Sequence, residues 1–70
     1  MDIKFAIVGC GRIAQRHAEH INKLGTLKAV CDIDYKKALE LGQKYNAASY
    51  QDFDEMLVEE KKISVVSVCT

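Results

Sequence analysis

The stretch that decides the fold is IKFAIVGCGRIA, residues 3–14. Residues 3–8 form a short, nearly continuous apolar run that ends at Gly9, which predicts a strand buried on both faces. From Gly11 to Leu24, apolar side chains recur every three to four residues, which predicts a helix with one buried face. The apolar positions on that face are Ile13, Ala14, Ala18, Ile21 and Leu24.

Beyond this unit the chain keeps alternating between strands and helices. Gly25 follows the last periodic residue of the first helix and suits a left-handed C-terminal cap. Asp34 and Asp52 suit the N-cap positions of two further helices. The expected elements are strands at residues 27–31, 47–50 and 63–69, a helix at 35–45, and a short helix after Asp52 with Phe53, Met56 and Leu57 on its inner face.

Strands that alternate with helices imply a parallel sheet, because each helix returns the chain to the same edge of the sheet. Right-handed crossovers place helices on both faces and give the strand order 3-2-1-4. The predicted fold class is therefore α/β, a doubly wound parallel sheet of the Rossmann type with the order β-α-β-α-β-α-β. We expect this sheet to be incomplete, since its apolar final strand would otherwise be a bare edge.

The glycine turn fits the pattern G-x-G-x-x-A, in which each position has a physical purpose. Gly9 permits the tight turn out of the strand, and Gly11 has no Cβ to obstruct a pyrophosphate. Ala14 is small enough for the helix to pack closely on the sheet. The free N–H groups near Arg12 and Ile13 point at the phosphates, and the Arg12 side chain is expected either to contact a phosphate directly or to lie over the adenosine side. The alternative is a glycine turn that binds nothing.

An acidic residue about twenty positions after the turn completes the context of a dinucleotide site. Asp32 ends the second strand, where its carboxylate can accept hydrogen bonds from both hydroxyls of the adenosine ribose. The same charge would repel a 2′-phosphate, so NAD is expected as cofactor in preference to NADP. Asp34 competes for this role but is better placed as a helix cap. Thr70 ends the fourth strand, beside Gly9, and is expected on the nicotinamide side of the crevice.

Composition excludes several other classes of protein. The chain has ten basic and ten acidic residues, so it lacks the basic balance that would favour nucleic acid, and it has no polybasic segment for a membrane. No apolar run reaches the ~18–20 residues of a membrane span, and the N-terminal residues do not resemble a signal peptide. We expect a cytoplasmic protein that binds neither nucleic acid nor a membrane.

Side chains with reactive chemistry are few. Three cysteines, Cys10, Cys31 and Cys69, form no C-x-x-C pair, which predicts reduced core thiols in place of disulfides or a zinc site. His17 and His20 lack further ligands at a suitable spacing, so no metal site is predicted, and we expect His17 to pack inside the helix layer. No residue in the chain suits the role of general acid or base, so no catalytic residue is predicted.

The combination of these motifs resembles the Gfo/Idh/MocA family of oxidoreductases, over the whole chain and in order. Within that family, Arg16 to His20 are most similar to the UDP-N-acetylglucosamine 3-dehydrogenases. The residues that carry the resemblance are the glycine loop at 9–14, His17, AVCDID at 29–34, residues 50–57 and VVSVCT at 65–70.

The resemblance implies that residues 1–70 are the N-terminal part of a dinucleotide-binding Rossmann domain, and that a C-terminal substrate domain is absent from this segment. Members of the family transfer a hydride between a nicotinamide cofactor and a hydroxyl of a sugar, sugar nucleotide or cyclitol. The glycine loop, Asp32 and Thr70 match the family's cofactor residues. Its catalytic lysine and histidine would lie beyond residue 70, so the segment alone is expected to be inactive. The full-length protein is expected to be a homo-oligomer.

Two alternatives come from other functional classes. A regulatory Rossmann module would sense NAD without chemistry. A methyltransferase would use a related glycine loop for S-adenosylmethionine, but Ile13 and Ala14 stand where a further glycine is common in those enzymes.

Overall fold

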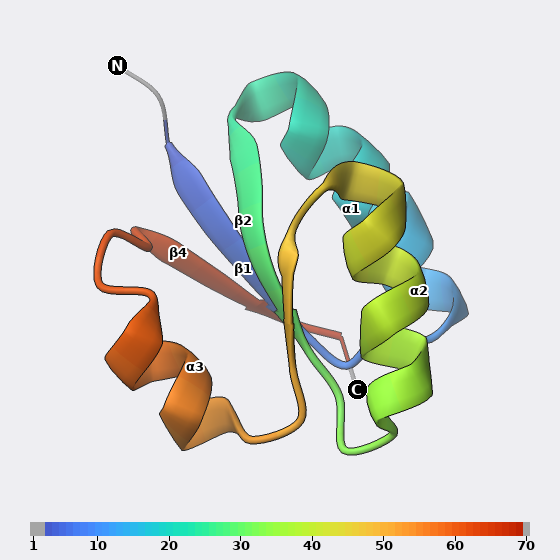
Figure 1. Ribbon diagram of the computed structural model, residues 1–70. Helices are drawn as coiled ribbons and strands as arrows, with labels where there is room; N and C mark the ends of the chain where they lie inside the picture. Colours follow the sequence, from blue (N-terminus) through green and yellow to red (C-terminus); the bar gives the residue numbers. More distant parts are fainter. Residues whose placement is uncertain (1–2, 70) are drawn as a thin grey trace.

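The computed structural model describes residues 3–69 and shows one parallel sheet with helices on both faces (Figure 1). The four strands lie in the order β3-β2-β1-β4, which confirms the predicted order. The elements are β1 (Lys4–Val8), α1 (Arg12–Leu24), β2 (Thr26–Cys31), α2 (Tyr35–Tyr45), β3 (Ala48–Tyr50), α3 (Phe53–Glu59) and β4 (Val65–Val68). None of the helices in residues 3–69 is long and apolar enough to cross a bilayer.

The central strand β1 sets the register of the sheet. Val8 is aligned with Cys31 of β2 on one side and with Val68 of β4 on the other. A bulge between Phe5 and Ala6 shifts the pairing with β2. Because all four strands run in the same direction, the carboxyl ends of β1, β2 and β4 meet at one edge of the sheet.

The two faces of the sheet carry cores of different size. Figure 1 shows α1 and α2 on one face and α3 on the other. The larger core joins the sheet to α1 and α2, and it contains Ile7, Cys10, Ala14, Ala18, Ile21, Leu27, Val30, Ala38 and Leu41. The smaller core lies under α3 and contains Ala6, Ala29, Cys31 and Met56. Alanines at the contacts let the helices approach the sheet closely.

Several side chains that were expected in the core are exposed. On α1, Ile13 is 62% and Leu24 is 73% exposed, and His17 is also exposed. The apolar stripe of α1 is thus narrower than its sequence suggests, because only three residues of the helix face the sheet. On α3, Phe53 and Leu57 are likewise exposed and Met56 alone is buried. A helix of seven residues has only about two turns, so few of its side chains face the sheet.

The turn between α1 and β2 differs from the prediction. Gly25 has a φ of −169°, which is extended and not left-handed. Glycine is needed there for a different reason: a Cβ would collide with the backbone oxygen of Ile3. That oxygen accepts a hydrogen bond of 2.8 Å from the N–H of Thr26, so the turn is pressed against the start of β1. The left-handed cap occurs instead at Asn46, after α2, where φ is 57°.

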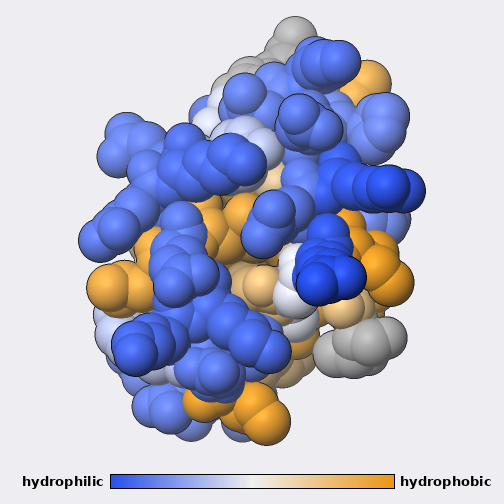
Figure 2. All heavy atoms as spheres, turned by 90° about the vertical axis from the view of Figure 1, so that its right-hand side faces the viewer, coloured by the Kyte–Doolittle hydropathy of each residue, from blue (hydrophilic) through white to orange (hydrophobic). Residues whose placement is uncertain are grey.

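Within the described residues β4 pairs with β1 alone, and its other edge is unpaired. Its side chains are also poorly covered. Val65, Val66 and Val68 are all exposed, and Val68 is 68% exposed. Figure 2 views the α1–α2 side of the molecule, where hydrophilic side chains dominate, and apolar atoms show in the hollow between them and at several points along the edge of the view.

Candidate functional site

The turn after β1 lies at the carboxyl edge of the sheet, as predicted. Gly9 has a φ of 91°, a conformation that side chains with a Cβ rarely adopt. Its N–H donates a hydrogen bond of 2.8 Å to the backbone oxygen of Cys31, so the turn is tied to the end of β2. The sequence pattern therefore identified a glycine that the local backbone requires.

Gly11 occupies the N-cap position of α1 and leaves open space in front of the helix. Its φ of −81° and ψ of −161° suit any residue. A Cβ added to Gly11 would have no heavy atom within 4 Å. The packing of the described residues does not account for a glycine at this position. Arg12 and Ile13 follow at the start of α1 and are exposed, while Ala14 is buried against the sheet.

Asp32 follows β2 and reaches across to the glycine turn. One carboxylate oxygen, Oδ2, accepts a hydrogen bond of 2.8 Å from the N–H of Cys10. The other, Oδ1, accepts a bond of 2.9 Å from the N–H of Asp34. The bond from Cys10 is the main reason that the pKa of the Asp32 carboxyl lies below its usual value. The Asp34 N–H and the charge of Lys37 act in the same direction, and partial burial opposes them. Asp32 is therefore ionised at neutral pH.

Asp34 stands at the N-cap position of α2, as predicted, but its side chain makes no capping hydrogen bond. Its backbone N–H serves Asp32 instead. By contrast, the Oδ1 atom of Asp52 accepts hydrogen bonds from the N–H groups of Asp54 and Glu55, at 2.8 and 3.2 Å. The cap predicted at Asp52 is thus confirmed in full, and that predicted at Asp34 only in position.

A cavity of about 200 Å³ opens beside Asp32 on the α3 side of the sheet. Its walls are mostly apolar, and the amide Nε2 of Gln51 donates a bond of 3.0 Å to the backbone oxygen of Ile33 across its rim. The lining residues are Val8, Gly9, Cys31, Asp32, Ile33, Gln51 and Phe53. Ile33, Gln51 and Phe53 were not predicted as site residues from the sequence. These three residues share a position that the sequence could have revealed: each closely follows β2 or β3, at the same edge of the sheet as the glycine turn.

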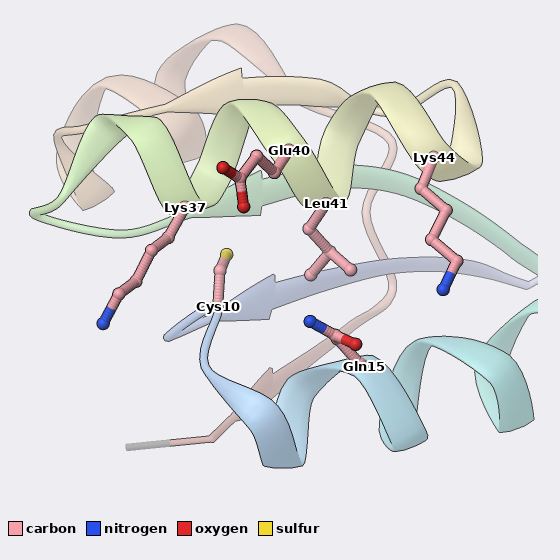
Figure 3. A pocket seen from close by; sticks show the side chains of 6 residues that line it. All are labelled: Cys10, Gln15, Lys37, Glu40, Leu41 and Lys44. Atoms are coloured by element: carbon pink, nitrogen blue, oxygen red, sulfur yellow. The ribbon is translucent and has the colours of Figure 1, made fainter.

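A second cavity, of about 140 Å³, lies between α1 and α2 behind the turn. Figure 3 shows Cys10 at one end, Gln15 projecting from α1, and Glu40 and Leu41 projecting from α2. Its charged lining includes Lys37 and Lys44, so the charges on its α2 wall are mixed.

The cysteines are free thiols, and Cys10 and Cys31 are buried, as predicted. Burial, followed by the charge of Asp32, raises the pKa of the Cys10 thiol to about 12. The pKa of Cys31 is raised for the same two reasons. Both groups are thus protonated at neutral pH and behave as small core residues. Within residues 3–69 no cluster of potential ligands is suited to a metal ion.

Thr70, the residue expected on the nicotinamide side, lies outside the described residues. Its neighbour Cys69 donates a backbone hydrogen bond of 2.8 Å to the oxygen of Val8. The carboxyl end of β4 therefore reaches the crevice where β1 ends, which is the switch point of a doubly wound sheet.

The strand order, the glycine turn after β1 and the acidic residue after β2 are all present. Together they define a doubly wound domain of the dinucleotide-binding class. Comparison with known proteins gives the family. Residues 3–70 match the family model GFO_IDH_MocA, described as an oxidoreductase family with an NAD-binding Rossmann fold. The chain belongs to this oxidoreductase family. The resemblance noted from the motifs is confirmed, and the family decides against a methyltransferase.

Individual relatives agree with the family. The chain is 35% identical to D-glucoside 3-dehydrogenase of Escherichia coli over 71 residues, which cover 97% of this chain and 20% of that protein. The WlbA dehydrogenase of Chromobacterium violaceum, solved with NADH and UDP-GlcNAcA, is 32% identical with a TM-score of 0.86, over 99% of this chain and 21% of that one. GenD2 from gentamicin A biosynthesis, solved with NAD, is 27% identical with a TM-score of 0.91, and the match covers 99% of this chain and 20% of that one. The chain spans about a fifth of the length of these relatives.

Proposed function

We propose that this chain is the cofactor-binding part of a dehydrogenase that transfers a hydride between NAD and a hydroxyl of a sugar, sugar nucleotide or cyclitol. Residues 1–70 would then be the N-terminal part of the Rossmann domain, and the substrate domain would lie in the rest of the protein. The observation that carries the proposal is the open space at Gly11, since a Cβ there would meet nothing of the protein itself.

The residues at the sheet edge fit a dinucleotide from its adenosine end to its phosphates. The apolar cavity beside Asp32 could take part of an adenine ring, and the ionised carboxylate would accept hydrogen bonds from the ribose hydroxyls. Gly9 and Gly11 let the pyrophosphate approach the N–H groups at Arg12 and Ile13, with the N-terminal charge of α1 adding attraction. Thr70 would contact the nicotinamide side.

The bound nicotinamide would supply the chemistry by accepting or returning a hydride. The residues of this chain bind and orient the cofactor, and none of the described ones is placed as general acid or base. The proton transfer that accompanies hydride transfer would therefore be the task of residues beyond this segment. The similarity to D-glucoside 3-dehydrogenase and to the WlbA dehydrogenase supports a sugar or sugar-nucleotide substrate.

The test is a fluorescence titration of the intact protein with NADH and with NADPH. We expect NADH to bind at least tenfold more tightly, because the charge of Asp32 repels a 2′-phosphate. Equal affinities would contradict the role of Asp32, and no binding of either cofactor would contradict the proposed function. A panel of glucosides, UDP-sugars and inositols, assayed by NADH formation, then identifies the substrate class.

Two further properties belong to the same proposal. The buried, reduced thiols support a cytoplasmic location. We expect the intact protein to be a homo-oligomer that binds neither nucleic acid nor membranes. Light scattering of the purified protein measures its oligomeric state.

A further inference from the structure

Asp32 has two neighbours that a simple ribose acceptor does not need. Its Oδ2 atom accepts from the N–H of Cys10, which is 22 residues away in sequence, and its Oδ1 atom accepts from the N–H of Asp34. One side chain thus joins the turn after β1 to the turn after β2. Both bonds are made by the protein alone.

The backbone of the turn that Asp32 contacts has a rarely adopted conformation, so it needs hydrogen bonds to stabilise it. Gly9 has a positive φ, and its neighbour Cys10 directs its side chain into the core, where it is only 5% exposed. The N–H of Gly9 and the thiol of Cys10 both donate to the backbone oxygen of Cys31, at 2.8 and 3.5 Å. The third hydrogen bond runs from the Cys10 N–H to Asp32. It is the only one of the three whose acceptor is a side-chain atom.

These ties still leave the carboxylate free to bind a ligand. A carboxylate has about four lone-pair positions, of which two are used here. Asp32 is only partly buried and borders the apolar cavity, so its remaining lone pairs are accessible from that side.

We infer that Asp32 is a positioning residue for the glycine turn as well as a ribose acceptor: it fixes the turn in its binding conformation before the cofactor arrives. The inference rests on the proposed dinucleotide function, because a held turn is useful only if a cofactor binds there. A turn that is already in its binding conformation loses less conformational entropy when the cofactor binds.

Two substitutions separate the positioning role from the ribose contact. Asp32→Glu keeps a carboxylate, which suffices for ribose in this class of site, but its longer side chain cannot hold both N–H groups in the present geometry. Asp32→Asn keeps the size but presents an amide N–H₂ to one of the two backbone N–H groups. Asp52→Asn is the matched control, since Asp52 also accepts from two backbone N–H groups, but both belong to α3 and neither to the glycine turn.

The decisive measurement is hydrogen exchange of the Cys10 amide in the intact, cofactor-free protein, at single-residue resolution and relative to Ile7 in β1. We expect both Asp32 variants to speed exchange at Cys10 at least tenfold relative to Ile7, and Asp52→Asn to leave that ratio unchanged. An unchanged ratio in the Asp32 variants would overturn the inference. So would rapid exchange of Cys10 in the unaltered protein, or an equal increase at Cys10 and Ile7.

A second measurement addresses binding. We expect Asp32→Glu to weaken NADH binding at least tenfold although the charge is retained, and full affinity in this variant would overturn the positioning role. Because the exchange experiment contains no cofactor, its result stands even if NADH fails to bind. Failure of the unaltered protein to bind NADH would contradict the proposed function alone.

Discussion

Replacing Gly11 with alanine should separate cofactor binding from folding. The new Cβ meets nothing within 4 Å, and the backbone angles at Gly11 are ordinary for alanine. Loss of chain entropy in the unfolded state favours alanine by roughly 0.4–1 kcal/mol. The weaker N-cap preference of alanine costs a similar amount, about 0.5–1 kcal/mol. The two effects nearly cancel, so we expect the free energy of unfolding to change by less than about 0.5 kcal/mol.

Binding should respond quite differently to the same change. The methyl group would occupy the space through which a pyrophosphate reaches the N–H groups at the start of α1. We expect the affinity for NADH to fall at least tenfold, which is about 1.4 kcal/mol. The assay is a fluorescence titration with NADH, together with thermal denaturation of the same preparation.

Gly42→Ala is the matched control, because it makes the same chemical change inside α2. Its Cβ would collide with Oγ of Ser49 and lie 2.7 Å from the backbone oxygen of Ala47. Overpacking of this kind costs about 1–3 kcal/mol. It also threatens the 3.1 Å hydrogen bond from Ser49 to the oxygen of Ala38. We expect lower stability but unchanged affinity for NADH in the folded fraction. A folded Gly11→Ala protein with full affinity would refute the reasoning, as would a selective loss of affinity in Gly42→Ala.

Three further predictions concern caps, titration and thiols. Asp52→Ala should lower the free energy of unfolding by about 1 kcal/mol in chemical denaturation, because it removes a helix cap. Asp34→Ala should lower it by only about a few tenths of a kcal/mol, because the Asp34 side chain makes no capping bond. Equal losses in the two variants would contradict this prediction. The Tyr50 hydroxyl donates a hydrogen bond of 2.6 Å to Oε2 of Glu60, the residue that follows α3, and this bond is the main reason that the pKa of Tyr50 is raised to about 12. The stabilisation from this bond should be complete below about pH 10, the usual tyrosine pKa, and disappear as the pH rises toward 12; a Tyr50→Phe variant with the same loss between these pH values would exclude that cause. Cys10 and Cys31 should resist alkylation in the native protein and react on unfolding, so rapid native labelling of either, detected by mass spectrometry, would contradict their burial.

The alternation of apolar runs was sufficient to predict the fold. Residues 3–8 and 63–69 are unlike any helix face in their continuity, and the connections between them leave a parallel sheet as the natural solution. The same periodicity did not tell which apolar residues are covered. Ile13 and Leu24 lie on the margins of the stripe of α1, and only the position of the helix on the sheet decides that they are exposed.

The candidate site was only partly accessible to sequence reasoning. Gly9, Gly11 and Asp32 are recognisable because their spacing reflects local geometry and one crossover. Gln51 and Phe53 gave no such signal, since they meet Asp32 only through the pairing of β3 with β2. The bond between Asp32 and the turn likewise depends on tertiary structure, because it joins N–H and carboxylate groups from separate crossovers.

The unequal cores on the two faces of the sheet have a consequence for motion. Met56 is the sole buried residue of α3, whereas α1 and α2 each bury three. The layer of α3 therefore has the smaller free energy of local opening. Phe53 begins this helix and also lines the cavity beside Asp32, so opening of α3 would carry one wall of that cavity away. A ligand that binds only the closed state would lower the population of the open state by mass action.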